Sequence, residues 1–220
     1  MLRDRLLRST AAAGATLVLI ASFSERVAAA EVSNDSGEAL VAQAVWGTAD
    51  LETGAGDYGM LAASIQDGQS VLFFYDQSEV AVVCDADTPG DPSDDYSGLS
   101  GTFRTATGSA DVQIAANLKT ASARATLTIE TILVDACAQQ WDVIAVEPGV
   151  DVSLNLSAVG RRDGWIDRFD ERVPGEFNSH AVLRSAAQPA TGTLSLGGEV
   201  SSVELGLISR NRWNGHFNGG

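Results

Sequence analysis

The feature that most constrains this chain is a repeated alternation of apolar and polar side chains with a period of two residues. Successive side chains of an extended strand point to opposite faces of a sheet, so this alternation places all the apolar residues on one face. Residues 112–119, 123–130 and 152–158 show it, and the apolar set of the second segment is Ala123, Ala125, Leu127 and Ile129. Helix signals are nearly absent after residue 30. The pattern therefore predicts antiparallel strands with one buried face and one face in contact with water.

Turn residues separate the apolar segments at the spacing expected of hairpins. Asp67-Gly68 and Gly197-Gly198 each lie between two such segments, and an Asp-Gly pair suits the positive backbone angles of a tight hairpin turn. Residues 76–79 are all polar and are predicted to link the strand before them to the strand after them. This spacing predicts about ten or eleven strands.

We predict a single all-β domain over residues 31–210, built as an antiparallel β-sandwich. A meander of this length buries its apolar faces either as two packed sheets or as a closed or partly open β-barrel, and spacing alone does not separate these arrangements. Residues 211–220 are polar and rich in glycine, so a flexible C-terminal tail is expected there.

The first thirty residues have the layout of a secretory signal peptide. Arg3, Arg5 and Arg8 precede an apolar run over residues 11–23, and small residues follow up to Ala30. The run is too short to span a bilayer comfortably, since spanning takes about 20 residues. The alternative is a short amphipathic helix packed on the fold. We expect cleavage after Ala30, no transmembrane segment in the mature chain, and a secreted protein in the extracellular space or the periplasm.

The chain is strongly acidic, with a formal net charge of −15. Beyond the predicted leader it carries ten cations and 27 anions, and Lys119 is its only lysine. Such a charge repels nucleic-acid phosphates and anionic lipid, which require basic patches. Nucleic acid is therefore not expected as a partner.

The two cysteines, Cys84 and Cys137, both lie in the predicted mature chain. Outside the cytosol an even pair of cysteines is typical of a disulfide, and we predict one here.

An acidic loop follows Cys84 and is a candidate calcium site. Calcium takes hard oxygen ligands from carboxylates and backbone carbonyls at flexible geometry. The spacing does not match an EF-hand, and the alternative is a solvated loop of turn-forming residues. The candidate ligands are Asp85, Asp87, Asp91, Asp94 and Asp95.

Residues 160–179 combine arginines with aromatic residues in an otherwise anionic chain. Arginine and tryptophan dominate interface energetics, and guanidinium groups hold anionic groups in pairs. A ligand site for a carbohydrate or an anionic partner is therefore predicted. Alternatively, Ile166, Phe169 and Val173 have the spacing of one amphipathic helical turn that caps the sheet core. The predicted contact residues are Trp165, Arg161, Arg162 and Arg168.

No catalytic residue is nominated by the sequence. His180 and His216 are the only histidines, and the sequence has no Gly-x-Ser-x-Gly elbow and no His-Glu-x-x-His zinc motif. We expect a non-enzymatic binding or structural module without a cofactor other than calcium. The alternatives are a secreted carboxylate-based hydrolase of the glycosidase type, which needs only two carboxylates flanking the scissile bond, and a purely structural envelope or matrix protein.

Overall fold

The computed structural model describes residues 32–49, 55–85, 95–173 and 177–219, and these residues form ten antiparallel strands and no helix. The predicted all-β antiparallel fold is confirmed, and the strand number agrees with the prediction. The predicted leader lies outside the described residues. The strands are β1 (Val32–Ala49), β2 (Gly56–Gln66), β3 (Gln69–Cys84), β4 (Tyr96–Ser109), β5 (Asp111–Ile114), β6 (Thr120–Asp135), β7 (Gln140–Ala158), β8 (Asp163–Val173), β9 (Phe177–Leu196) and β10 (Glu199–Gly219).

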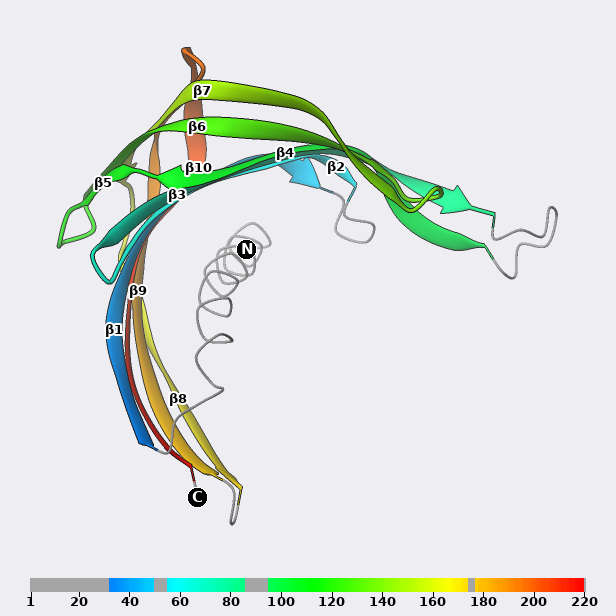
Figure 1. The fold of residues 1–220 in the computed structure, drawn as a ribbon. Coiled ribbons are helices and arrows are strands. Elements are labelled where there is room, and N and C mark those ends of the chain that lie inside the picture. The colour runs from blue at the N-terminus through cyan, green and yellow to red at the C-terminus, as the bar shows by residue number, and fades with distance from the viewer. Residues whose placement is uncertain (1–31, 50–54, 86–94, 174–176, 220) are drawn as a thin grey trace.

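All ten strands belong to one hydrogen-bonded sheet. Its order is β10-β1-β2-β3-β4-β6-β7-β9-β8, and β5 pairs with β6 beside this path. β9 also pairs with β10. The hydrogen-bonded neighbours can therefore be followed from β10 through β1, β2, β3, β4, β6 and β7 to β9, and from β9 back to β10. β8 pairs only with β9, so it forms an edge of the described sheet. Figure 1 shows that the sheet is strongly bent.

The core lies between two parts of this bent sheet. β1, β2 and β3 contribute one set of buried side chains, β6, β7 and β9 contribute the other, and β10 adds Val203 and Ile208. Each fully buried Leu, Ile or Phe side chain stabilises the fold by about 1.5–3 kcal/mol relative to an exposed one. We call the face of the sheet that carries these residues the inner face and the opposite face the outer face. The largest fully buried apolar side chains are Phe74, Leu61, Leu72, Leu118, Ile129, Leu154 and Ile208.

Both predicted glycine-containing turns are confirmed. Asp67 and Gly68 connect β2 to β3 with φ angles of 52° and 76°, and Gly197 and Gly198 connect β9 to β10 with φ angles of 59° and 92°. These left-handed conformations are those that a two-residue hairpin requires.

The predicted linker at residues 76–79 is wrong, because β3 runs through it without interruption. These polar residues pair with β2 on one side and β4 on the other. Their side chains also find partners: Trp46 Nε1 donates to Asp76 Oδ1 over 3.3 Å, and Ser78 Oγ donates to Asp57 Oδ1 over 2.6 Å. Polarity alone therefore does not end the strand.

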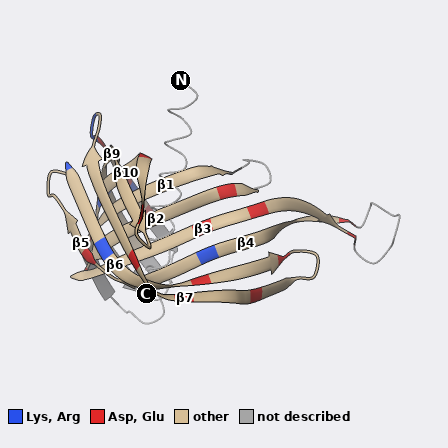
Figure 2. Cartoon of the chain, turned by 90° about the horizontal axis from the view of Figure 1, so that it is seen from above, with Lys and Arg blue, Asp and Glu red and all other residues tan. Residues whose placement is uncertain are grey.

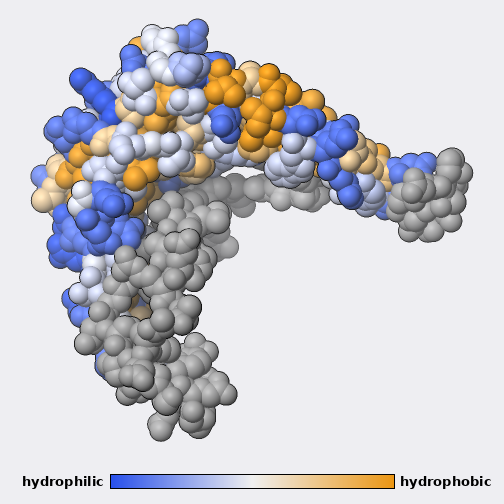
Figure 3. Space-filling model, viewed as in Figure 1, coloured by the Kyte–Doolittle hydropathy of each residue, from blue (hydrophilic) through white to orange (hydrophobic). Residues whose placement is uncertain are grey.

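The strands extend beyond the core and form two arms, which run in different directions in Figure 1. The disulfide arm consists of residues 75–84, 96–103, 131–135 and 140–146, and Figure 2 shows acidic residues along its strands β3 and β7. The arginine arm consists of β8 with residues 32–40, 177–187 and 209–219. Figure 3 shows hydrophobic surface along the part of the disulfide arm where β6 and β7 run.

The predicted disulfide is confirmed at the end of the first arm. Cys84 ends β3, and Cys137 lies in the turn between β6 and β7, with a Cα–Cα distance of 5.1 Å. The bond therefore joins two chain segments on either side of β4.

The predicted loop with a helical turn at residues 160–179 is wrong. Residues 163–173 form β8, and β9 begins at Phe177. The spacing of three between Ile166 and Phe169 places them on one side of a helix but on opposite faces of a strand. The regular pairing of β8 with β9 satisfies backbone groups that an isolated turn would leave unpaired.

The sequence predicts a flexible tail at residues 211–220, whereas residues up to Gly219 belong to β10. This segment pairs with β1 on one side and β9 on the other. Two neighbouring strands satisfy its backbone hydrogen bonds, so the segment needs no apolar alternation of its own.

Candidate binding face on the arginine arm

The structure does not bring the four predicted contact residues together. Arg161 and Arg162 lie in the connection before β8, while Trp165 and Arg168 lie on β8 itself, and all four side chains are exposed. Trp165 and Arg168 are an odd number of residues apart on a regular strand, so they point to opposite faces.

Arg168 instead shares its face with arginines from the next two strands. Arg168 lies opposite Val182 of β9, and Arg184 lies two residues further along the same face. Arg184 lies directly opposite Arg212 of β10, and Arg210 precedes Arg212 on that face. Directly opposed residues of an antiparallel pair have Cβ atoms about 4.5–5.5 Å apart. The sheet register thus gathers arginines that are far apart in the sequence.

We call this surface the arginine face, and it continues the inner face of the sheet beyond the core. Ile208 of β10 is fully buried in the core, and Arg210 and Arg212 follow it on the same side of the strand. Within the described residues the face comprises Arg168, Arg184, Arg210 and Arg212 with Glu38, Asp170, His180 and His216.

Glu38 neutralises only part of this positive charge. Its carboxylate oxygens lie 3.1 Å from Arg210 Nε and 2.5 Å from Arg212 Nε. Arg168 and Arg184 are exposed, and no acid in the described part of the chain forms an ion pair with either of them. These two guanidinium groups are therefore the ones open to an external anion.

The two histidines meet on the same face. His180 of β9 lies directly opposite His216 of β10, and His180 Nδ1 contacts Asp170 Oδ1 of β8. Both imidazoles are exposed. Sequence reasoning did not place them together, because their meeting depends on the β9–β10 register.

The opposite face of β8 is aromatic. Trp165 and Phe169 point to this face and are 45% and 57% exposed. Ile166 lies on the arginine face and is 58% exposed. The prediction that arginine and aromatic side chains act together at one spot therefore does not match the alternation along β8.

The calcium prediction falls largely outside the described residues. Asp85 and Asp95 are exposed at the ends of β3 and β4, while Asp87, Asp91 and Asp94 lie outside the described part of the chain. Among the residues that are described, no group of three or more His, Cys, Asp or Glu side chains is arranged to hold a metal ion. Calcium binding stays a prediction.

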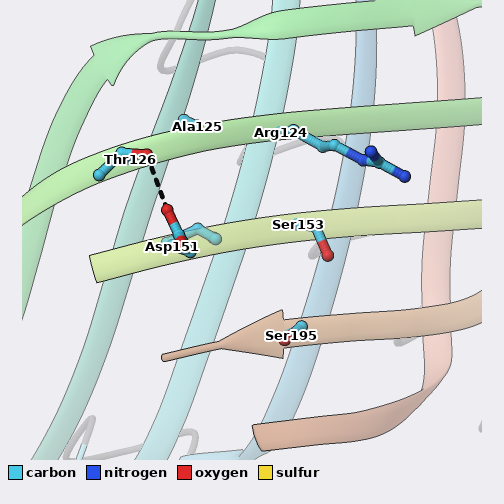
Figure 4. A pocket seen from close by; sticks show the side chains of 7 residues that line it. Arg124, Ala125, Thr126, Asp151, Ser153 and Ser195 are labelled. Atoms are coloured by element: carbon cyan, nitrogen blue, oxygen red, sulfur yellow. Dashed lines mark hydrogen bonds between the residues drawn. The ribbon is translucent and has the colours of Figure 1, made fainter. Parts of the chain in front are cut away.

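A shallow hollow of about 400 Å³ lies on the outer face of β6, β7 and β9, where Figure 4 shows other strands of the sheet crossing behind them. Thr126 Oγ1 donates to Asp151 Oδ1 over 2.7 Å, and the Arg124 side chain extends away from that pair. Arg124 is an isolated exposed arginine and forms no ion pair within the described residues. It provides a natural reference for the clustered arginines.

The part of the chain that the structure describes contains no helix with the length and apolar character needed to cross a lipid bilayer. A scan against protein-family models, a search of curated proteins and a search of solved structures each gave no match. The chemistry of the surface residues is therefore the basis for a functional proposal.

Proposed function

We propose that this protein is an exported, non-enzymatic binding module that holds a polyanionic partner on the arginine face. The observation that carries the proposal is the register of β8, β9 and β10, which sets Arg168 and Arg184 on one exposed face beside the Arg210–Glu38–Arg212 cluster. Guanidinium groups bind carboxylate, sulfate and phosphate oxygens in a bidentate geometry.

An extended anion fits this face better than a small one. The arginines lie on an open sheet surface, and neighbouring strands are about 4.8 Å apart. A polymer that carries an anionic group on each repeat can therefore meet guanidinium groups of successive strands. The net charge of −15 opposes non-specific adsorption of such a polymer elsewhere on the chain.

The disulfide supports the cellular setting of the proposal. Disulfides persist in oxidising compartments and are rare in the cytosol, so Cys84–Cys137 is in keeping with export. An exported binding module meets extracellular polymers, many of which carry carboxylate or sulfate groups.

The test compares charged and neutral polymers with the intact chain. We expect binding to dextran sulfate if the face accepts sulfate groups, or to polygalacturonate if it accepts carboxylate groups. Neutral dextran should not bind through this face. The Arg168→Gln/Arg184→Gln variant should lose at least tenfold in affinity, which corresponds to about 1.4 kcal/mol. Because the face is exposed, binding should also weaken as the salt concentration rises.

Arg124→Gln is the control, since it removes one arginine charge, half of what the double variant removes, from an exposed position away from the arginine face. It should leave the affinity unchanged. If net charge alone governed binding, this single variant would lose about half as much binding free energy as the double variant, and that result would contradict the proposal.

A further inference from the structure

The outer face of the disulfide arm has a groove of about 380 Å³ near its end. Its lining residues come from β3, β4, β6, β7 and the β6–β7 turn, and they are Glu79, Leu99, Val134, Ala136, Gln139 and Trp141. The register explains the gathering, because Val134 lies opposite Gly101 on β4 and opposite Trp141 on β7. Leu99, Val134 and Ala136 give the groove an apolar lining.

Trp141 forms an open aromatic wall of this groove. Its side chain is 68% exposed, although it packs edge-on against Phe103 with 5.8 Å between ring centroids. Phe103 in turn contacts Tyr75 at 5.9 Å, so three aromatic rings extend across the arm from β7 to β3. The Trp141 ring is thus held on one side by Phe103, while most of its surface stays accessible.

Polar groups line the same groove. The Glu79 carboxylate and the Gln139 amide supply hydrogen-bond acceptors and donors next to Trp141. Partial burial raises the pKa of Glu79, which is in keeping with its apolar surroundings. No cation lines the groove in the described residues, so an anionic ligand has no partner there.

The groove is held by a covalent bond and by local hydrogen bonds. Ala136 of its wall precedes Cys137, whose disulfide reaches Cys84 at the end of β3. The backbone N–H of Ala136 donates to Ser100 Oγ over 3.0 Å, and the Tyr96 hydroxyl donates to the carbonyl oxygen of Ala136 over 3.3 Å. These contacts fix the turn that carries Gln139.

We propose that this groove binds a neutral sugar unit of a polysaccharide, with the sugar ring stacked on Trp141 and its hydroxyl groups hydrogen-bonded to Glu79 and Gln139. A sugar ring has an apolar C–H face that suits an exposed indole and a polar rim that suits a carboxylate and an amide. The combination of an apolar lining with a few convergent polar groups is typical of ligand sites. This site is separate from the arginine face and does not depend on it.

The test is affinity electrophoresis of the intact chain in gels that contain soluble neutral polysaccharides, namely glucans, a mannan, a xylan and a galactan. We expect at least one polymer to retard the protein. Trp141→Ala should weaken that binding at least tenfold, and Glu79→Gln should weaken it less. Reduction of the disulfide should also weaken it, because the turn that carries Gln139 loses its tether.

Trp165→Ala is the matched control, since it removes an exposed tryptophan from the other arm. It should bind as the unchanged protein does, and so should Arg168→Gln/Arg184→Gln, which separates this site from the arginine face. The proposal would be overturned if no polymer retarded the protein. It would also be overturned if Trp141→Ala and Trp165→Ala lost polysaccharide affinity equally. If the unchanged protein bound an apolar dye but no polysaccharide, and Trp141→Ala lost the dye binding, the groove would instead be assigned to an apolar partner.

Discussion

The two arms are both extensions of the sheet beyond the core, but they are held in place by different means. The disulfide arm is tied at its end by Cys84–Cys137, to which Tyr96 adds hydrogen bonds. In the arginine arm the Trp213 ring packs over Gly37, where an added Cβ atom would overlap the ring. Beyond the central core each arm therefore has a tether of its own, which is a covalent bond in one arm and a packed ring in the other.

The arms also differ in the surface that they expose. The outer face of the disulfide arm carries Trp141, Val143 and Val146, each more than half exposed. The arginine arm instead places Arg184 directly opposite Arg212. Exposed apolar patches and opposed like charges both reduce stability or solubility. Each arm thus exposes an unfavourable surface of a different kind, and the two proposed binding sites lie on these surfaces.

The largest expected effect that separates the arms is loss of the disulfide. Cys84 and Cys137 are 53 residues apart, and by the chain-entropy model closing such a loop contributes about 4 kcal/mol. The Cys84→Ser/Cys137→Ser variant should therefore lose about 4 kcal/mol in its free energy of unfolding, measured by urea denaturation. Hydrogen exchange should speed up in residues 96–103 and 131–146.

Residues 177–187 of the arginine arm serve as the internal control for that experiment. Hydrogen exchange in these residues should speed up only by the amount that the loss of global unfolding free energy accounts for. A loss of protection of the same size in both arms would mean that the disulfide stabilises the whole sheet evenly, and the two-tether interpretation would be wrong.

A tryptophan truncation in each arm sharpens the comparison. Trp213 is 9% exposed and Trp141 is 68% exposed. Trp213→Ala should therefore cost about 3 kcal/mol of stability, whereas Trp141→Ala should cost less than about 1 kcal/mol. Thermal and urea unfolding of the two variants provide the measurement.

Trp213→Phe tests whether the ring or its N–H group matters. Trp213 Nε1 is buried and has no hydrogen-bond partner within the described residues, so the N–H group adds no stabilising hydrogen bond and its burial costs free energy. The phenylalanine variant should keep most of the stability that the alanine variant loses. Equal losses in Trp213→Phe and Trp213→Ala would contradict the assignment of Trp213 as a packed tether.

The sequence predicts those parts of the fold in which side-chain pattern and burial coincide. In β6, alternate residues Ala121, Ala123, Leu127 and Ile129 are buried, as a period of two requires. The hairpin turns and the disulfide also follow from local residue types. β8 and the end of β10 could not be recognised, because their stability comes from neighbouring strands rather than from an apolar alternation.

The candidate sites were less accessible to sequence reasoning than the fold. Arg168 was found from a local cluster, but Arg184 and Arg212 become its neighbours only through pairing between β8, β9 and β10. The one local signal was the spacing of two between Arg210 and Arg212, which places both on one face of a strand. The groove near Trp141 gave no local signal, since four strands contribute to it.

The smallest expected effect concerns Asp76, on the inner face of the disulfide arm. Burial raises the pKa of Asp76, while the hydrogen bond from Trp46 and the charge of Arg104 lower it in part. A carboxyl group with a raised pKa binds its proton more tightly in the folded state than in the unfolded state. Its contribution to stability is therefore present in acid and is lost as the pH rises from about 4, the ordinary range of a carboxyl group, toward its folded value.

Asp76→Asn removes this titration and tests the sign of that effect. The melting temperature of the variant, relative to the unchanged protein, should rise as the pH increases from 4 to 7, by a small amount because Asp76 is only half-buried. Asp67→Asn, in the exposed β2–β3 turn, removes the same charge away from the arm and corrects for the change in net charge. A relative melting temperature that stays constant with pH would show that the Trp46 and Arg104 contacts balance burial, and one that falls as the pH increases would show that they outweigh it. The inner face of this arm would then be stabilised by its ion pairs, as the face around Glu38 is in the other arm.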